Sequence, residues 1–266
     1  MVSPPPAGTA PLPITEVETG AVRTGYAIIT PDTGSLSPLT TLTFGLVSGG
    51  IVQSQALVLP TALTDEGAVQ VDVVLAIGRN LGLAIANPDN TTAAVTLILR
   101  DEDGKVKGSP VTISIPARQQ LARFVTEMLP PSTIGAAFRG SLSLQSTIPV
   151  SVIGLRFSGS AFSTAPVFAN GAAGVPSRTL VSGQAVGGAN ALMFSQFAVS
   201  GGWATTLSLM NMTSTAISGH IDILDTSGNP LAVKLNGATQ STFVYSIPAR
   251  GTFLLAPRDA NGQSPF

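Results

Sequence analysis

The stretch that decides the fold is VQVDVVLAIGRNLGLAIANPDNTTAAVTLILRDEDGKV, residues 69–106. Short runs in which apolar and polar residues alternate are separated by Gly, Asn, Asp and Pro, a pattern that predicts strands joined by turns. The same order returns in MFSQFAVSGGWATTLSLMNMTSTAISGHIDILDTSGNPL, residues 193–231, at a constant offset of 124 that pairs Asn87 with Asn211. The sequence therefore predicts an internal repeat of one β unit.

A matching phrase follows each copy of the repeat. Ile-Pro-Ala-Arg occurs at residues 115–118 and again at residues 247–250, at an offset of 132. After the first phrase come two further strand-like runs, FRGSLSLQS and PVSVIGLRF, within residues 138–167. No such runs follow the second phrase in this sequence.

The front of the chain supplies the best match to these two runs. Gly25 aligns with Gly140, YAIIT with SLSLQ, LTTLTFGL with VSVIGLRF, and VQSQALVLP with FSTAPV. Residues 23–60 are therefore predicted to complete the module that begins in the second copy. Two geometries satisfy this order: the strands fold back within one chain as a circular permutation, or they complete the module of a neighbouring chain.

The predicted organisation has five segments. They are a proline-rich extended tail (residues 1–20), strands that complete a module of the 192–257 type (21–60), module A (61–168), a Gly/Ala-rich linker (169–191) and the incomplete module B (192–266). The predicted fold class is all-β, with two antiparallel immunoglobulin-like β-sandwich domains and terminal strand exchange. Apolar residues at helical spacing from Leu121 to Leu129 predict one or two helical turns.

Composition limits the function. Charged residues are 10% of the 266 and the net charge is −1, so the chain has no basic field that would hold nucleic acid. Cys is absent, which excludes disulfides and thiol chemistry. No apolar run reaches the ~18–20 residues that a membrane span needs.

No catalytic, cofactor-binding or metal-binding residue is predicted, and the protein is not expected to be an enzyme. His220 is the one histidine and lies in an alternating strand, so no Ser-His-Asp triad can be argued from it. DEDGKV places Asp101, Asp103 and Gly104 as in a calcium loop but lacks the terminal Glu. A hairpin turn is the better prediction there.

The predicted strand exchange assigns side chains to a donor and an acceptor. The donor residues are Tyr26, Ile28, Leu42 and Phe44, and the acceptor residues are Leu207, Leu209, Ile223, Phe253 and Leu255. The face on which each set lies depends on register, because a slip of one residue exchanges the two faces of a strand. Asn90 and Asn211 begin N-glycosylation sequons in matched turns, where exposed side chains are expected.

GWATTLSLMNMTSTAISGHIDILDTSGNPL, YSIPARG and FRGSLSLQSTIPVSVIGLRF resemble the tandem modules of large, mostly uncharacterised secreted bacterial β-sandwich proteins. The resemblance covers roughly residues 20–168 and 192–257, implies an exported all-β protein, and carries over no catalytic residue. We therefore expect an extracellular or cell-surface filament subunit that joins identical subunits head to tail, with surface glycans as a further partner. The alternative is a monomeric secreted carbohydrate-binding or adhesin module with a circularly permuted domain.

Overall fold

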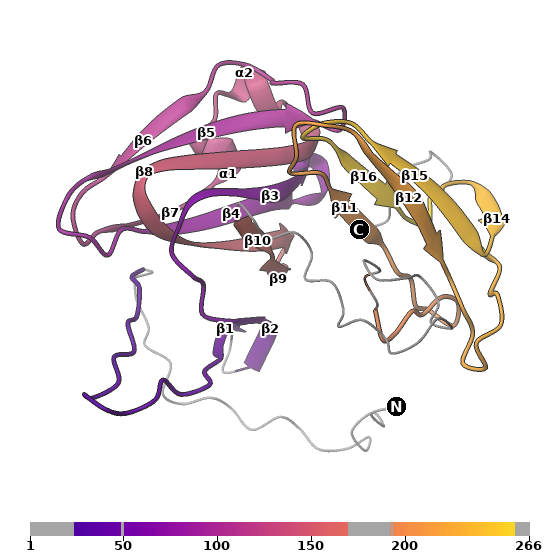
Figure 1. Ribbon diagram of the computed structural model, residues 1–266, viewed down its shortest axis with the longest axis horizontal. Helices are drawn as coiled ribbons and strands as arrows, with labels where there is room; N and C mark the ends of the chain where they lie inside the picture. Colours follow the sequence, from indigo (N-terminus) through magenta and orange to yellow (C-terminus); the bar gives the residue numbers. More distant parts are fainter. Residues whose placement is uncertain (1–23, 49–50, 170–191, 193, 259–266) are drawn as a thin grey trace.

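The computed structural model describes residues 24–48, 51–169, 192 and 194–258 (Figure 1). Strands make up 54% and helix 5%, which confirms the all-β class. The predicted proline-rich tail and all but the first residue of the predicted linker lie outside the described residues. In the described part of the chain, no helix is both long enough and apolar enough to cross a membrane.

Strands run through all three parts of the chain. Before module A come β1 (Leu42–Ser48) and β2 (Ile51–Val58). Module A holds β3 (Thr64–Val74), η1 (Leu75–Ile77), β4 (Arg79–Ala86), β5 (Ala93–Asp101), β6 (Val111–Ile115), β7 (Gln120–Phe124), α1 (Val125–Met128), α2 (Pro131–Ile134), β8 (Ala137–Ser158), β9 (Ala161–Ala165) and β10 (Val167–Ala169). Module B holds β11 (Leu207–Met210), β12 (Ile217–Asp222), β13 (Val233–Leu235), β14 (Ala238–Gln240), β15 (Thr242–Ile247) and β16 (Thr252–Leu255).

Strand β8 organises module A. The two strand-like runs predicted around Pro149 are one continuous strand of 22 residues. Its first half pairs with β3 on one side and β5 on the other, and its second half pairs with β4 and β9. All eight strands of module A therefore belong to one sheet that bends with β8, as Figure 1 shows.

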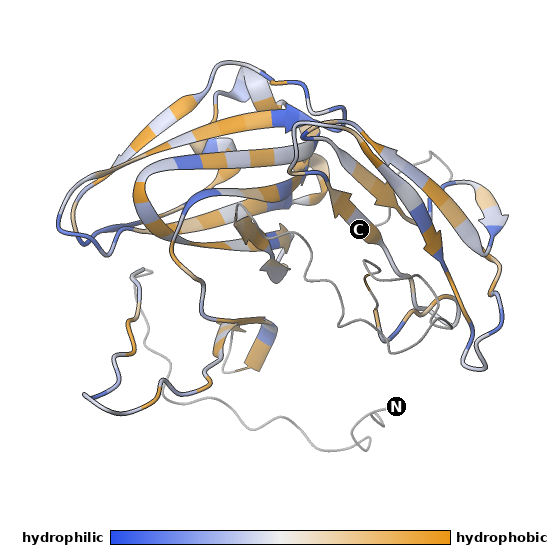
Figure 2. Ribbon diagram, in the orientation of Figure 1, coloured by the Kyte–Doolittle hydropathy of each residue, from blue (hydrophilic) through white to orange (hydrophobic). Residues whose placement is uncertain are grey.

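The core of module A follows from the alternation of apolar residues along its strands. Val69, Val71 and Val73 of β3 are completely buried, and so are Leu142 and Leu144 of β8. Figure 2 shows the same alternation of hydrophobic and hydrophilic residues along β5 and β8. Each large apolar side chain buried in this way stabilises the fold by ~1.5–3 kcal/mol.

The predicted helical turns are shorter than their spacing suggests. Leu121 and Phe124 belong to β7, whereas α1 begins at Val125 and ends at Met128. The carboxylate of Glu127 accepts a hydrogen bond from the backbone N–H of Phe124 at 2.7 Å, which caps the first turn. Val125 and Met128 point into the core, so the helical spacing serves the packing of a single turn.

Module B is less complete than module A. Its described strands form three separate two-stranded sheets, β11 with β16, β12 with β15, and β13 with β14. Its buried cluster consists of Ile223, Val233, Leu235, Phe243 and Leu255. Val233 and Leu235 come from the extra hairpin β13–β14, which has no counterpart strand in module A.

A buried asparagine builds the same turn in both copies of the repeat. The side-chain amide of Asn87 donates to the carbonyl oxygens of Thr91, Ile115 and Pro116 at 2.8, 3.0 and 3.1 Å. Asn211 donates to the three matching carbonyls, those of Thr215, Ile247 and Pro248, at 2.7, 3.2 and 2.9 Å. Because both side chains are fully buried, these bonds satisfy polar groups that water cannot reach.

The Ile-Pro-Ala-Arg phrases also form one turn twice. Arg118 and Arg250 have φ angles of 57° and 59°, an uncommon conformation for a residue other than Gly. The backbone N–H of Arg118 donates to Asp89, and that of Arg250 donates to Thr213, each at 3.1 Å. The turn therefore holds each arginine to the loop that begins with the buried asparagine.

The predicted hairpin turns at DEDG and DTSG have the same geometry. The N–H of Gly104 donates to the carbonyl of Asp101 at 2.9 Å, and the N–H of Gly228 donates to that of Asp225 at 3.1 Å. Both glycines have positive φ, which a side chain would disfavour. The backbone N–H groups of Asn229 and Ser227 bond the carboxylate of Asp225 and lower its pKa.

Modules A and B meet at two of these turns. The backbone N–H of Thr252 donates to the carbonyl of Glu102 at 3.0 Å. Arg250 forms an ion pair with Glu66 at 3.7 Å. A Cβ atom added to Gly251 would lie 2.6 Å from the Glu102 oxygen, so this approach requires glycine.

Candidate assembly site

The site begins with the position of β8 among its neighbours in module A. Strand β5 lies between β6 and the first half of β8. Strand β4 lies between β7 and the second half of β8. Each of these two strands therefore has both of its edges hydrogen-bonded.

Module B reproduces the outer partners of these strands in the same register. Ile217 of β12 faces Ile247 of β15, as Ala93 of β5 faces Ile115 of β6. The pairing of β11 with β16 likewise repeats that of β4 with β7, residue for residue. The sequence offsets of 124 and 132 therefore relate strand pairs that are present in both modules.

The inner edges differ between the modules. Among the described residues, β12 pairs only with β15 and β11 only with β16, so no strand occupies the place that β8 takes in module A. Unpaired N–H and C=O groups at such edges are able to bind a further strand. In module A, β8 covers both of the corresponding edges.

Two of the predicted acceptor residues are less buried than their counterparts in module A. Leu83 and Ile85 of β4 are 2% and 0% exposed, whereas their counterparts Leu207 and Leu209 remain half-buried. Phe253 is half-buried too. Ile223 and Leu255 are buried within the small cluster of module B. Leu207 and Phe253 pack against this cluster, and Leu209 lies opposite Phe253. These three acceptor side chains keep part of their apolar surface uncovered.

The predicted donor residues are not on this surface in the described chain. Tyr26, Ile28, Leu42 and Phe44 are 41%, 66%, 43% and 37% exposed. Residues 24–41 form no strand. The structure therefore brings the acceptor residues together and leaves the donor residues apart from them.

Strands β1 and β2 form a hairpin that lies beside module A. The hydroxyl of Ser54 accepts from the N–H of Phe162 in β9 at 3.0 Å, and the hydroxyl of Thr164 donates to the carbonyl of Leu57 at 2.5 Å. These contacts involve side chains, and β2 joins no strand of module A through its backbone. Figure 1 shows the hairpin apart from the strands of module B.

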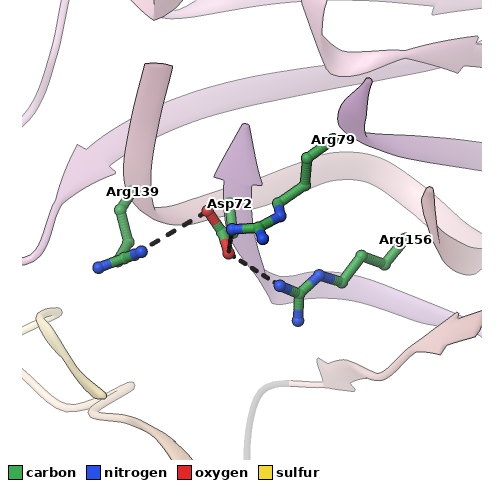
Figure 3. Close-up of polar contacts among 4 residues, drawn as sticks. All are labelled: Asp72, Arg79, Arg139 and Arg156. Carbon is green, nitrogen blue, oxygen red and sulfur yellow. Dashed lines mark hydrogen bonds and ion pairs between the residues drawn. The ribbon is translucent and has the colours of Figure 1, made fainter. Parts of the chain in front are cut away.

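A cluster of charged side chains surrounds Asp72 of β3 (Figure 3). Its carboxylate lies 3.2 Å from Arg79, 2.9 Å from Arg156 and 3.9 Å from Arg139. The side chains of Asp72 and Arg79 are only 11% and 4% exposed. Three guanidinium groups on β4 and β8 therefore share one buried carboxylate on β3. Sequence analysis missed this cluster, because residues spaced so irregularly give no pattern.

The cluster carries more positive than negative charge. Burial lowers the pKa of Arg156, Asp72 opposes this effect, and the neighbouring charges of Arg79 and Arg139 lower the pKa further. One carboxylate oxygen of Asp72 has no hydrogen-bond partner, although it lies in a buried position. Asp72 is therefore the group that makes three adjacent arginines tolerable inside the sheet.

Substituting Asp72→Asn should destabilise the folded chain by about 3 kcal/mol, because the variant leaves buried guanidinium groups without a counter-ion. The expected loss is at the low end for a buried ion pair, since solvent screens Arg156, which is 35% exposed. Urea unfolding at pH 7 measures it. Asp103→Asn is the matched control, because Asp103 and Lys105 are 65% and 74% exposed. Equal losses in both variants would contradict this role of Asp72.

The other candidate residues have ordinary surroundings. His220 is 60% exposed at its side chain and lies 3.3 Å from Asp222. Burial raises the pKa of Asp101, but bonds from Lys107 and from the backbone of Lys105 outweigh this effect and lower it. The described residues include no group of three or more His, Cys, Asp or Glu side chains placed to hold a metal ion.

The two sequons differ in exposure. Asn90 is exposed, and its side-chain oxygen accepts a hydrogen bond from Arg118 at 2.8 Å. The expectation that Asn211 is exposed is wrong, because this residue is 1% exposed. Its amide nitrogen, the atom that would carry a glycan, donates three hydrogen bonds within the turn. The repeat explains the difference, since Asn211 aligns with the buried Asn87 and not with Asn90.

Comparisons with known proteins do not identify a family. No protein-family model and no curated protein matches the chain. The Anabaena sensory rhodopsin transducer is similar over 35% of this chain and 97% of its own, with 16% identity and a TM-score of 0.32. The crystal structure of Thermotoga maritima 1070 is similar over 40% of this chain and 92% of its own, with 14% identity and a TM-score of 0.32. Neither likeness indicates a function.

Proposed function

We propose that this protein is a structural subunit of an extracellular filament, in which residues 22–60 of one chain complete module B of the next. The observation that carries the proposal is the missing counterpart of β8. Module B repeats β4, β5, β6 and β7 of module A in the same registers, yet no strand of the described residues pairs with the edges that β8 covers in module A. Residues 23–60 are the part of this sequence that resembles β8 and β9.

The hairpin β1–β2 supports this assignment. It corresponds to the hairpin that the second half of β8 forms with β9, and in both the strands are antiparallel. Half of the completing unit is thus already folded before it meets module B. Preorganisation of this kind reduces the entropy lost on association.

Exchange between chains has a defined geometry. The donor segment precedes module A and the acceptor follows it, so the two binding surfaces of one subunit differ. A heterologous contact of this type adds subunits in one direction and gives an open filament unless the rotation closes a ring. Each added subunit contributes main-chain hydrogen bonds and apolar side chains to an unfinished sheet. No catalytic step is part of this function.

A second candidate function is carbohydrate binding by a monomer. One observation favours it: Trp203 is 74% exposed and borders a hollow of module B that Lys234 and Pro257 also line. An exposed indole provides an apolar face with a polar edge. Binding of a neutral glycan by the full chain, lost in Trp203→Ala, together with particles that stay monomeric, would favour this function over the filament.

The filament is tested with the full chain by negative-stain microscopy and sedimentation. We expect fibres or concentration-dependent multimers. A labelled peptide of residues 22–60, added in excess, should bind the chain and shorten the multimers, because it fills module B without supplying another acceptor. The reversed-sequence peptide is the control. Monomer-sized particles at every concentration, with no binding of the peptide, would rule out strand exchange between chains.

A further inference from the structure

The first half of β8 contains a position where only glycine fits. At Gly140 the strand passes so close to β5 that an added Cβ atom would overlap the carbonyl oxygen of Arg100. Gly140 lies opposite Asp101 in the register of β8 and β5. A methyl group at this position would force the two backbones apart and break the pairing.

The donor segment carries a glycine at the matching place. Gly25 aligns with Gly140 and stands directly before YAIIT, as Gly140 stands before SLSLQ. In the described chain, Gly25 has no neighbouring atom within 4 Å of the position of a Cβ. Nothing inside its own subunit therefore requires glycine at residue 25.

We infer that Gly25 fixes the register of the donor strand on a second copy of this chain, with Gly25 opposite Asp225 and the strand antiparallel to β12. This inference rests on the proposed filament and names the contact that builds it. It follows from the pairs of β8 with β5, because Asp225 and Ile223 are the counterparts of Asp101 and Leu99. Residues 25–30 then extend from Asp225 to His220.

The register determines which donor side chains enter the core. Leu142 and Leu144 are completely buried in module A, and Ser143 between them is half-exposed. Ala27 and Ile29 take the positions of the two leucines, opposite Ile223 and Ile221. Tyr26 and Ile28 of the predicted donor set are therefore placed on the opposite face of the strand in this register, one residue away from the face predicted for them.

The opposite face contains a pair of residues that differs between the modules. Ser141, which is 2% exposed, faces Arg100 in module A, where both side chains are polar. The corresponding residues of the complemented module B are Leu224 and Tyr26, whose hydroxyl donates to the carbonyl of Arg118 at 3.1 Å in the described chain. In the described chain Tyr26 is 41% exposed and Leu224 is 38% exposed. Opposite each other on neighbouring strands, they would cover one another.

The first test is Gly25→Ala in the full chain. Overpacking of this kind should raise the concentration needed for assembly about tenfold or more. The far-ultraviolet spectrum and melting temperature of the dilute subunit should not change, because a Cβ atom at residue 25 would meet no atom of its own chain within 4 Å beyond the two neighbouring residues. Thr24→Ala is the control in the same segment and should assemble normally. Gly140→Ala should lower the melting temperature of the subunit itself, since its strand pair lies within module A.

The second test is disulfide trapping, which a chain without cysteine allows. Thr30→Cys combined with His220→Cys should give a ladder of covalent multimers on oxidation, because the counterparts Gln145 and Thr96 face each other. The side chains of Thr30 and His220 are exposed, so the two substitutions leave the core unchanged. Ile29→Cys or Pro31→Cys with His220→Cys represents a slip of one residue and should cross-link poorly.

The outcomes separate the register from the function. Normal assembly of Gly25→Ala, or a ladder from the slipped pairs, overturns the register and leaves the filament standing. A lower melting temperature of the dilute Gly25→Ala subunit also overturns it, because Gly25 then packs within its own chain. Absence of multimers in the unmodified protein and in every cysteine pair removes both the register and the filament.

Discussion

Deletion of residues 1–60 is expected to abolish assembly and to leave module A folded. Every strand of module A, from Thr64 to Ala169, lies after the deletion, and its core cluster contains no residue of the deleted segment. Module B of the truncated chain has no donor in any other copy, so its open edges stay unpaired. Sedimentation should show monomers and disordered aggregates, and fibres should be absent.

Two measurements make this result specific. The melting transition of module A should persist in the truncated chain, and the peptide of residues 22–60 should bind it with one site per chain. The bound peptide should suppress aggregation, because it covers the apolar edges of β11 and β12. Fibres formed by the truncated chain would contradict the proposed assembly.

Substituting Asn87→Ala should destabilise module A strongly. The alanine variant loses three donated hydrogen bonds and leaves the buried carbonyl oxygen of Ile115, and those of Thr91 and Pro116, without this partner. Unsatisfied buried groups cost ~1–3 kcal/mol each, so the expected loss is about 3–5 kcal/mol. The melting temperature should fall by roughly 10–20 °C.

The contribution of the hydrogen bonds can be separated from that of side-chain volume. Asn87→Asp keeps the size of the side chain but turns a carboxyl group toward three carbonyl oxygens, so it should destabilise at least as much as Asn87→Ala. Asn90→Ala is the control, because Asn90 is exposed and makes one side-chain bond to Arg118. A mild effect of Asn87→Asp would show that packing, and not hydrogen bonding, holds the turn.

The all-β class and several strand pairs could be predicted, because the two copies of the repeat can be compared with each other. The offsets of 124 and 132 locate the same strand pairs in both modules, and the alternation of residues identifies the buried face of β8. The continuity of β8 could not be predicted, since Pro149 lies between its two runs and normally interrupts a central strand. The strand tolerates this proline where it changes partners from β5 to β4.

The candidate site could be predicted only in part. The acceptor residues follow from alternation in and next to β11, β12 and β16. Ile223 and Leu255 belong to the buried cluster of module B, and Leu207 and Phe253 pack against it. The buried face of the donor strand could not be predicted from YAIIT, because the adjacent residues Ile28 and Ile29 within it are both apolar and lie on opposite faces. The close approach of Gly140 to the carbonyl oxygen of Arg100 indicates the register of the donor strand. It could not be predicted, because it depends on the distance between two backbones. The Asp72 cluster is likewise a product of tertiary structure, because it joins β3 and β4 to two distant positions of β8.

The position of the β1–β2 hairpin against β9 has a consequence for the order of synthesis. The ribosome completes β2 at Val58 and reaches β16 at Thr252 about 10–40 s later, at ~5–20 residues per second. During that interval module A emerges, and β9 becomes available to the hairpin before any strand of module B exists. We therefore expect a nascent chain to hold its donor segment beside module A until release, which delays both closure on its own module B and premature growth at the ribosome.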